Sequence, residues 1–389
     1  GVSYGKLRLG WAQVGNDADP YQLLDPYASD TPFGDAPRYT ASNRLRNYNL
    51  KPEQTRSWEF GAEMRFFEDR FGFDVTYYNS KTFNQIVPVD ISPLTGFTTK
   101  MMNAGTLANK GIELVLDATA LSLDNGFRWD VSGTFGMNRN KVVELAEGIE
   151  TLVLDTYYGV NVEARVGERY GAMYGRKYVR DSKGNIVVGS NGQPLNTSAN
   201  PFGYLGNYNP DWTAGIRNRF SWGPFSAHVL IDGQMGGTIY SLTTYYGRRS
   251  GVLIETLQGR EKGRTIAEGG GLIVKGVKVV NGDTVPNDIL VDAQAYWRGL
   301  GPISESCVFD ATYAKLREIR VAYQLPPAVL NRLRISSGEV AVVGRNLALW
   351  TDVPHIDPET AFHSGNVQGF EYSQQPTART IGFSILLTP

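Results

Sequence analysis

The feature that most constrains the fold is a long run of alternating apolar and polar residues at positions 54–87. Between residues 57 and 66 every second residue is Trp, Phe, Ala or Met, and the residues between them are Ser, Glu, Gly and Arg. A second alternating arm follows a turn at residues 68–70. Successive side chains of a strand point to opposite faces, so this hairpin has one aromatic, apolar face and one charged face. Each arm exceeds the ~5–6 residues of a usual soluble strand and reaches the about 9–11 residues that cross a membrane. We therefore predict one face in lipid and the other in a wet lumen.

The same alternation recurs along the rest of the chain and predicts about ten strands. The further strands are expected at residues 4–16, 111–123, 127–135, 212–222, 225–232, 308–323, 339–350 and 377–387. Short turns are expected at 68–70, 124–126, 223–224 and 325–332, and long loops at 17–53, 88–99, 140–210, 236–306 and 351–375. Outer-membrane barrels have short periplasmic turns and long extracellular loops. The fold class is thus all-β, a transmembrane antiparallel β-barrel. If all the short turns lie on the periplasmic side, the number of strands requires residues 164–179 to lie in an outer loop. A small hairpin is also expected, with an arm at 273–280 that turns at Asn281-Gly282.

Composition agrees with this fold and excludes several classes of function. The formal net charge of -1 over 389 residues gives no reason to expect nucleic acid as a partner. No apolar run of about 18 residues exists, so no transmembrane helix is expected. The single cysteine, Cys307, excludes an internal disulfide and a thiolate metal site. No signal peptide opens the chain, and a bacterial membrane barrel needs one, so we expect the natural N-terminus to be missing.

Two clusters could carry chemistry, and a structural interpretation is favoured for both. Ser226, His228 and Asp232 share the charged face of one predicted strand, which raises the possibility of a membrane lipase. Neighbours two residues apart on a strand lie ~6.6–7 Å apart, too far for a hydrogen-bonded triad, so we interpret these residues as lumen lining. The second cluster could bind a metal and consists of His355, Asp357, Glu359 and His363. We interpret it as a set of turn and cap residues. We expect no enzyme activity, metal or cofactor.

Eight motifs occur in order along nearly the whole chain. They are Lys6-Leu7-Arg8 with Gly15-Asn16, LKPEQTRSWEFG at 50–61, NAGTLANKGIEL at 103–114, GNYNPDWTAG at 206–215, YAKLREIRVAY at 313–323, GRNLALWTD at 344–352, HIDPET at 355–360 and PTARTIGF at 376–383. No single motif is decisive. Together, in this order and spacing, they resemble the C-terminal half of SusC/RagA-type TonB-dependent outer-membrane transporters of Bacteroidota.

The resemblance implies a larger protein than this chain. Members of that family have a barrel of about 22 strands and roughly a thousand residues, an N-terminal plug with a TonB box, and a SusD-like surface lipoprotein as a lid. Residues 1–389 then supply the C-terminal barrel portion, about ten strands, without the plug and the N-terminal strands. Ten strands cannot close at that diameter, and open edges in lipid are prohibitive. Another polypeptide must complete the barrel, most simply the N-terminal part of the same protein.

The implied function is active import of oligosaccharides or oligopeptides across the outer membrane. TonB-ExbB-ExbD would drive it through the N-terminal part, and outer-membrane lipid would surround the barrel. The alternative is a soluble or surface-displayed β protein that binds glycans and uses its apolar face as a sandwich core. That alternative predicts shorter strands and no alternation of short and long connections.

Three groups of residues are assigned roles on this interpretation. Residues expected to contact substrate or the lid, with ordinary loop packing as the alternative, are Tyr157, Tyr158, Tyr245, Tyr246, Arg248 and Arg249. Residues expected to line the lumen and meet the plug are Glu59, Glu63, Asp74, Glu113, Asp117, Arg128, Arg217 and Arg219. Residues expected to form the membrane's aromatic girdles are Trp58, Phe66, Phe67, Trp129, Trp212 and Trp222.

Overall fold

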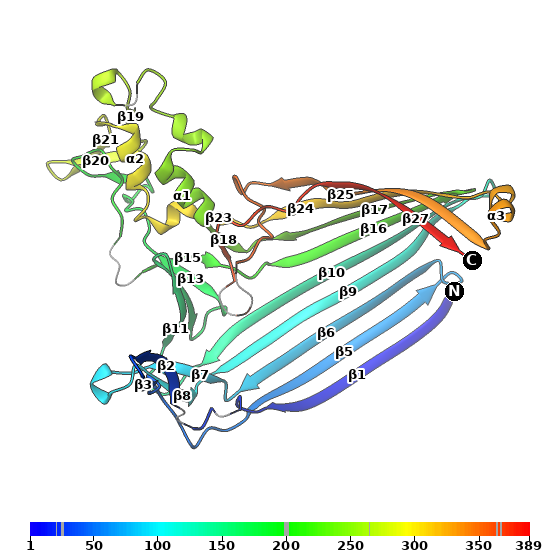
Figure 1. Cartoon of the computed structure of the whole chain (residues 1–389), viewed down its shortest axis with the longest axis horizontal. Coiled ribbons are helices and arrows are strands. Elements are labelled where there is room, and N and C mark those ends of the chain that lie inside the picture. Colours follow the sequence, from blue (N-terminus) through cyan, green and yellow to red (C-terminus); the bar gives the residue numbers. More distant parts are fainter. Residues whose placement is uncertain (21, 25–26, 198–201, 264, 363–364, 366–367) are drawn as a thin grey trace. The chain divides into compact units, whose positions relative to one another are not determined.

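The computed structural model describes residues 1–20, 22–24, 27–197, 202–263, 265–362, 365 and 368–389. Its main element is a ten-stranded sheet (Figure 1). In spatial order the strands are β1 (Val2–Asn16), β5 (Glu53–Phe66), β6 (Phe71–Phe83), β9 (Thr106–Ser122), β10 (Phe127–Glu144), β16 (Trp212–Trp222), β17 (Phe225–Met235), β24 (Tyr313–Gln324), β25 (Ser337–Thr351) and β27 (Thr380–Thr388). The predicted number of strands and their chain order are confirmed. Strands of up to 18 residues also argue against the soluble alternative.

The chain divides into two compact units. The first comprises Gly1–Leu116, Gly136–Leu152 and Ala164–Tyr170, and the second comprises Asp117–Phe135, Val153–Glu163 and Gly171–Pro389. Strands β9 and β10 contribute residues to both units. Among the described residues, no helix combines the length and the apolar character that a membrane crossing requires.

In the first unit, antiparallel register sorts the side chains onto the two faces that the alternation predicts. Leu9 lies opposite Phe60 of β5, and Phe60 lies opposite Tyr77 of β6, so apolar side chains line up across three strands. On the other face the Arg8 guanidinium binds Asp74 and lies 3.7 Å from the Glu63 carboxylate. This face is charged and internally paired, and the opposite face is apolar.

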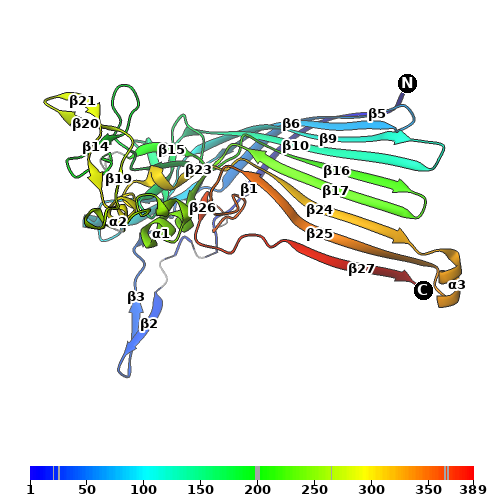
Figure 2. The same cartoon turned by 90° about the horizontal axis from the view of Figure 1, so that it is seen from above.

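In the second unit, β16, β17, β24, β25 and β27 run side by side in one layer (Figure 2). The side chains with the largest apolar exposure lie on the last strand, where Ile381 is 72 % exposed and Phe383 is 85 % exposed. Phe383 pairs with Val342 of β25, which is itself half-exposed. Each strand therefore keeps an apolar face that nothing in the described chain covers.

The short connections lie where the sequence predicts them, with one difference. The β5–β6 turn places Phe67, Glu68 and Asp69 at positive φ, and the β16–β17 turn is built on Gly223 at φ 54°. The connection between β24 and β25 is wider than a turn because it contains α3 (Pro327–Leu333). Proline is tolerated in the first turn of a helix, where its missing N–H has no partner to lose. Pro327 therefore starts a helix here rather than closing a turn.

Several segments that the sequence assigns to plain loops contain short strands, which corrects the prediction for them. Residues 17–53 contain the hairpin of β2 (Ala28–Phe33) and β3 (Ala36–Thr40), followed by β4 (Arg44–Leu45). Residues 88–99 lie within β7 (Ile86–Asp90), the 3-10 turn η1 (Pro93–Thr95) and β8 (Thr99–Asn103). β4, β8 and β7 form a small sheet. These strands are too short for periodicity to distinguish them from loop.

The connection at 140–210 holds a separate four-stranded sheet. Its strands are β11 (Thr151–Tyr157), β12 (Val160–Arg165), β13 (Ala172–Gly175) and β15 (Gly203–Asn207). β13 lies within residues 164–179 and is not part of the ten-stranded sheet, as strand parity predicts. β14 (Val187–Val188) pairs in parallel with β20 (Val277–Val280).

The largest connection, at 236–306, carries most of the helix in the second unit. It contains β18 (Thr238–Ser241), α1 (Leu242–Ser250), η2 (Ile254–Leu257), η3 (Ile266–Glu268), β19 (Leu272–Ile273), β20, β21 (Asp283–Pro286), β22 (Leu290–Val291), α2 (Ala293–Gly299) and η4 (Ser304–Cys307). The predicted small hairpin exists as β20–β21 around Asn281-Gly282, both at positive φ. β23 (Val308–Asp310) and β26 (Phe370–Glu371) flank β18 in a three-stranded sheet.

Candidate functional site

Four of the tyrosines selected from the sequence lie together in the second unit. Tyr157 ends β11 and Tyr158 follows it in the turn to β12, while Tyr245 and Tyr246 belong to α1. Tyr372, just after β26, joins them, so three segments far apart in the sequence meet here. We call these five residues the tyrosine cluster.

The cluster is held by ring contacts and by hydroxyl hydrogen bonds. The Tyr158 ring centroid lies 6.0 Å from that of Tyr245, 5.9 Å from that of Tyr246 and 5.9 Å from that of Tyr372. The Tyr246 hydroxyl donates to the Tyr158 hydroxyl at 2.8 Å, and the Tyr158 and Tyr372 hydroxyls lie 3.3 Å apart. Tyr158 and Tyr246 remain 41 % exposed. The cluster thus presents aromatic rings and hydroxyls to the outside.

A buried core beneath the cluster fixes its geometry. Tyr240 and Phe370 are fully buried, and Tyr157 packs edge-on against Phe370 at 5.6 Å. Tyr158 has φ 49° and precedes Gly159 at φ 77°, so the turn after β11 uses left-handed backbone at two positions. Such backbone is unusual for a bulky residue and persists where surrounding packing enforces it. Tyr158 is therefore placed by the fold rather than by local preference.

A buried carboxylate ties the last loop to the start of α1. Glu371 is fully buried and accepts hydrogen bonds from the Ser241 hydroxyl at 2.9 Å and from the Thr243 backbone N–H at 3.0 Å. The Ser241 hydroxyl in turn accepts from the Thr244 backbone N–H. The N-terminus of a helix has free N–H groups and a positive dipole end, which stabilise a carboxylate there. Glu371 therefore positions both α1 and Tyr372.

Two hydroxyls of the cluster have raised pKa values. Hydrogen bonding with Tyr246 and then with Tyr372, together with burial, raises the pKa of Tyr158 above its ordinary value. Burial also raises the pKa of Tyr157. These two hydroxyls therefore stay protonated and can donate or accept hydrogen bonds beside the exposed rings. Such a surface suits a sugar or a protein contact.

The two arginines grouped with these tyrosines in the sequence do not join the cluster. Arg248 donates from Nε to Glu255 at 3.2 Å and from Nη1 to the Ser306 carbonyl at 2.6 Å. Its guanidinium lies 5.9 Å from the Trp297 ring centroid. Arg249 is exposed at the end of α1. The arginines follow the tyrosines by one helical turn and line a different surface.

The residues expected to line the lumen lie on sheet strands of both units. In the first unit Glu63 lies directly opposite Asp74, and Arg8 bridges the two carboxylates. In the second unit Arg128 donates to Asp130 at 2.8 Å, and Arg219 lies opposite His228. The remaining members are exposed on their strands and are Glu59, Glu113, Asp117 and Arg217.

Most of the residues expected to form aromatic girdles lie near the ends of their strands. Phe66 packs against Phe67, Phe71 and Phe73 at the β5–β6 turn, with Phe67 in the turn itself. Trp129 stacks on Phe220 at 5.7 Å, and Trp222 is 60 % exposed beside the β16–β17 turn. Trp212 begins β16 and lies 6.0 Å from Phe135. Trp58 differs, because it lies in the interior of β5, 6.3 Å from Trp11.

The two clusters considered for chemistry have structural partners instead. Asp232 accepts a hydrogen bond from Arg317 at 2.6 Å, and within the described chain no hydrogen bond joins His228 to Ser226 or Asp232. Asp357 binds Lys315 at 2.7 Å, Glu359 binds Lys315 and Arg317, and His355 binds Glu255 at 2.8 Å. His363 lies outside the described residues.

Sequence reasoning missed three residues of the site, Phe370, Glu371 and Tyr372. They follow one another in a connection that otherwise shows no period, and two aromatics around a carboxylate were the only local signal. Their role depends on the parallel pairing of β26 with β18, in which Phe370 lies opposite Tyr240 and Glu371 opposite Ser241. That pairing is a long-range contact, and alternation along the sequence does not report it.

Comparison with known proteins identifies the family. The family model of the TonB-dependent receptor-like β-barrel matches residues 3–299. The chain belongs to this family. It is 25 % identical over 97 % of its length to the TonB-dependent receptor P3 of Formosa agariphila, covering 39 % of that protein. It is 29 % identical over 51 % of its length to the TonB-dependent receptor SusC of Bacteroides thetaiotaomicron.

Solved structures show the same fold. The structure of the RagAB peptide transporter matches 99 % of this chain with a TM-score of 0.74 at 19 % identity, and the matched part is 41 % of that transporter chain. Together with the family match and the similarity to SusC, this fold confirms the resemblance to SusC/RagA-type TonB-dependent receptors, which are outer-membrane proteins of Bacteroidota. The chain spans about two fifths of the length of the relatives that it matches over most of its own length.

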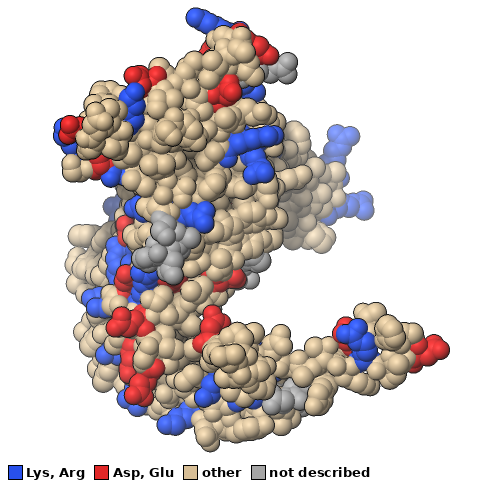
Figure 3. All heavy atoms as spheres, turned by 90° about the vertical axis from the view of Figure 1, so that its left-hand side faces the viewer, with Lys and Arg blue, Asp and Glu red and all other residues tan. Residues whose placement is uncertain are grey.

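Charged side chains of both signs lie on the face shown in Figure 3. They occur there in small interspersed groups with uncharged surface between them.

Proposed function

We propose that this chain is the C-terminal barrel portion of a TonB-dependent importer of oligosaccharides or oligopeptides. The family match and the names of the similar proteins, SusC and the RagAB peptide transporter, support this proposal. The N-terminal part of the same protein supplies the plug and the remaining strands, and TonB-ExbB-ExbD acts through that part. A SusD-like lipoprotein covers the outer side. No step in this function is enzymatic.

The observation that carries the proposal is the apolar face that the wall strands leave exposed. On one face of β27 every residue is large, apolar and exposed, namely Ile381, Phe383, Ile385 and Leu387. Large contiguous apolar surfaces of this kind are rare on soluble monomers and are what a lipid bilayer covers. The opposite face carries ion pairs such as Arg8 with Asp74, which suits a wet lumen next to a plug.

The order of the strands supports a further polypeptide in the barrel. The sheet begins with β1 and ends with β27, and each has one neighbour in the strand order. Backbone N–H and C=O groups without partners in lipid cost several kcal/mol each, so the free edge of each strand needs a partner. The N-terminal strands of the complete transporter fill this role.

The tyrosine cluster is the proposed contact for substrate or for the lipoprotein lid. It combines exposed rings, neutral hydroxyls and a rigid base, which is the chemistry that holds a sugar ring or a polar peptide. The lumen-lining and girdle residues described above take the roles expected of them from the sequence. Specificity in such barrels lies in loops, and this cluster is built entirely from connections.

The test uses the complete transporter with its lipoprotein in a Bacteroidota host that lacks the native gene. We expect Tyr158→Ala and Tyr246→Ala to reduce uptake at least about tenfold, since losing an aromatic contact in a binding surface costs more than 1 kcal/mol. Tyr39→Ala, at a 67 %-exposed tyrosine of the first unit, is the matched control. Normal uptake by both cluster variants would remove the cluster from the proposal. A complete protein that fractionates without the outer membrane would overturn the transporter assignment.

A further inference from the structure

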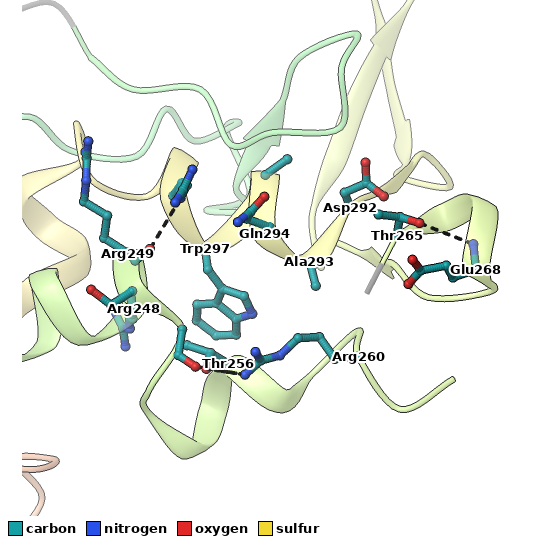
Figure 4. A pocket seen from close by; sticks show the side chains of 14 residues that line it. Arg248, Arg249, Thr256, Arg260, Thr265, Glu268, Asp292, Ala293, Gln294 and Trp297 are labelled. Atoms are coloured by element: carbon teal, nitrogen blue, oxygen red, sulfur yellow. Dashed lines mark hydrogen bonds between the residues drawn. The ribbon is translucent and has the colours of Figure 1, made fainter. Parts of the chain in front are cut away.

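A polar pocket opens beside the tyrosine cluster, at the C-terminal end of α1. It has a volume of about 530 Å³ and is lined by the last turn of α1, the segment around η2 and η3, and the first turns of α2 (Figure 4). Pockets of roughly 300–1,000 Å³ are the size that holds small ligands. We call it the α1–α2 pocket. Two of the residues that the sequence assigns to substrate or lid contact, Arg248 and Arg249, line it.

The lining of the α1–α2 pocket is predominantly basic. Among the residues that the structure describes, four arginines line it, Arg248, Arg249, Arg260 and Arg298, against two acidic residues, Glu268 and Asp292. Four positive charges minus two negative charges leave a net charge of two positive. Asp292 already accepts the Ile266 backbone N–H at 2.6 Å, and Glu268 has partners within the chain. The acidic groups are thus engaged by the protein.

Arg260 marks the floor of the pocket and retains an unused donor. Its Nη2 donates to the Gly251 carbonyl at 3.1 Å and to the Thr256 hydroxyl at 2.8 Å. Its Nε is buried and has no hydrogen-bond partner among the residues that the structure describes. A buried donor without a hydrogen-bond partner is unfavourable, so a carboxylate oxygen that reaches it is favoured. In Figure 4 the Arg260 side chain extends toward Thr256, below Trp297.

The pocket rests on a packed support. Trp297 is 8 % exposed, donates from Nε1 to the Gln258 carbonyl at 3.4 Å, and belongs to a core with Ala293, Leu300 and Ile303. Arg248 is fixed by Glu255 and Ser306, as described above. A pre-ordered basic surface loses little conformational entropy when a ligand binds.

We propose that the α1–α2 pocket binds a small ligand through a carboxylate group, and that this ligand is an acidic portion of the imported substrate. Guanidinium groups pair with carboxylates through charge-assisted, often bidentate hydrogen bonds. The assignment to substrate rests on the proposed import function, whereas the binding itself does not. The tyrosine cluster and the pocket share α1, so one helix serves both surfaces. A carboxylate of this kind occurs on uronic acid sugars and on acidic peptide side chains.

The test measures binding calorimetrically to the complete transporter with its lipoprotein, purified in detergent, so that transport is not required. The sugar probes are digalacturonate and its neutral counterpart α-1,4-galactobiose. The peptide probes are N-acetylglutamate amide and the isosteric N-acetylglutamine amide. We expect one acidic probe to bind at least about tenfold more tightly than its neutral counterpart, since hydrogen bonds to a charged group are stronger than those between neutral groups. The acidic probe that binds identifies the source of the carboxylate.

The decisive variant adds a negative charge without removing a contact. Gln294 lines the pocket from α2, is exposed, and makes no hydrogen bond within the described chain. We expect Gln294→Glu to weaken binding of the acidic probe at least about fivefold through repulsion, and Gln294→Ala to change it less than about twofold. Arg298→Gln removes one positive charge and is expected to weaken it also. Arg332→Gln, at an exposed arginine of α3, is the control for arginine loss.

Each outcome decides the proposal. The proposal is supported if an acidic probe binds more tightly than its neutral counterpart and Gln294→Glu weakens that binding. Equal binding of acidic and neutral probes, or binding that Gln294→Glu and Arg298→Gln leave unchanged, overturns it. Failure of the import function would give a different result from failure of the pocket proposal. Tyr158→Ala would then change uptake no more than its control does, while the acidic probe would still bind.

Discussion

Two phenylalanines of the second unit show how differently two regions use the same side chain. The first region is the ten-stranded sheet, which we call the wall, and the second is the connections between its strands. Phe383 of β27 is 85 % exposed, and Phe370 of β26 is fully buried under the tyrosine cluster. The wall strand leaves its apolar residues uncovered because lipid is their solvent. The connections stand in water and must bury theirs among segments from distant parts of the chain.

This difference has a consequence for specificity. The wall is built from local alternation and cross-strand pairing, so one side chain can change with little effect on its neighbours. The cluster combines α1, the turn after β11 and the segment after β26, and a change in any one of them reaches the other two. We therefore expect the connections to lose more stability than the wall when a buried side chain is shortened. We expect the wall to lose more stability than the connections when a charge is introduced on its apolar face.

The largest expected effect comes from Phe370→Ala. Removing a buried phenylalanine costs about 3–5 kcal/mol because it leaves a cavity. The ring contacts of Phe370 with Tyr240 and with Tyr157 are lost, so the start of α1 and the last loop loosen. Hydrogen exchange of the complete transporter should show faster exchange at residues 240–246 and 370–372.

The matched variant is Phe383→Ala, which removes the same side chain from the wall. Exchange at residues 240–246 should then equal that of the wild type. Equal loosening by both variants would show that the buried and the exposed phenylalanine stabilise one cooperative unit, and the contrast between wall and connections would fail.

A charge on the wall is the second largest effect. Ile385 is 69 % exposed, and Ile385→Arg places a guanidinium in lipid, which costs about 2–4 kcal/mol near the bilayer midplane. We expect lower outer-membrane levels and a lower melting temperature of the barrel in unboiled gels. Ser384→Arg, on the opposite face of the same strand, is expected to be tolerated. Equal damage by the two substitutions would contradict lipid on the Ile385 side.

A smaller effect is expected from Tyr158→Phe, which keeps the ring and removes the hydroxyl. Two hydroxyl contacts are lost, to Tyr246 and Tyr372, and each contributes roughly 0.5–1.5 kcal/mol at most. Uptake should fall less than with Tyr158→Ala. A loss as large as that of alanine would mean that the hydroxyl, not the ring, contacts the substrate or the lid.

The strands of the wall could be predicted from the sequence because apolar and polar residues alternate along them with a period of two. Alternation at residues 57–66 and 377–387 sets the faces, and turn residues such as Gly223 set the ends. The short strands inside 17–53 and 140–210 could not be predicted, since two to seven residues are too few to show a period. The helix α3 was missed because Pro326-Pro327 signals a turn and a helix start equally well.

The site was predictable only in part. Four tyrosines stand out as two doublets, and the structure brings both doublets together. Two other placements depend on contacts between distant segments. Arg248 binds Ser306, which is 58 residues away, and Glu371 binds Ser241, which is 130 residues away. Lys315 is similar, since its place on a strand does not reveal that Asp357 and Glu359 of the last loop neutralise it.

That ionic group gives the last and smallest effect at neutral pH. Burial raises the pKa of Glu359, but hydrogen bonds from Arg317 and Lys315 outweigh it and lower the pKa to about 2. Burial also raises the pKa of Asp357. Hydrogen bonds from Lys315 and Thr377 outweigh burial, so the pKa of Asp357 is lowered. A carboxylate with a lowered pKa contributes stability above its unfolded pKa of about 4.5 and loses it as the pH falls through its folded pKa.

The melting temperature of the complete transporter should therefore be level between pH 8 and about 5 as far as this group is concerned, and should fall from about pH 4.5 toward pH 2. Glu359→Gln should lower it at neutral pH and make the acid-induced fall shallower. The exposed pair of Arg8 and Asp74 on the wall is expected to contribute at most about 1 kcal/mol, so Asp74→Asn should leave the acid limb nearly unchanged. An acid limb that flattens with Asp74→Asn and not with Glu359→Gln would place the pH-sensitive contacts in the wall instead of the connections.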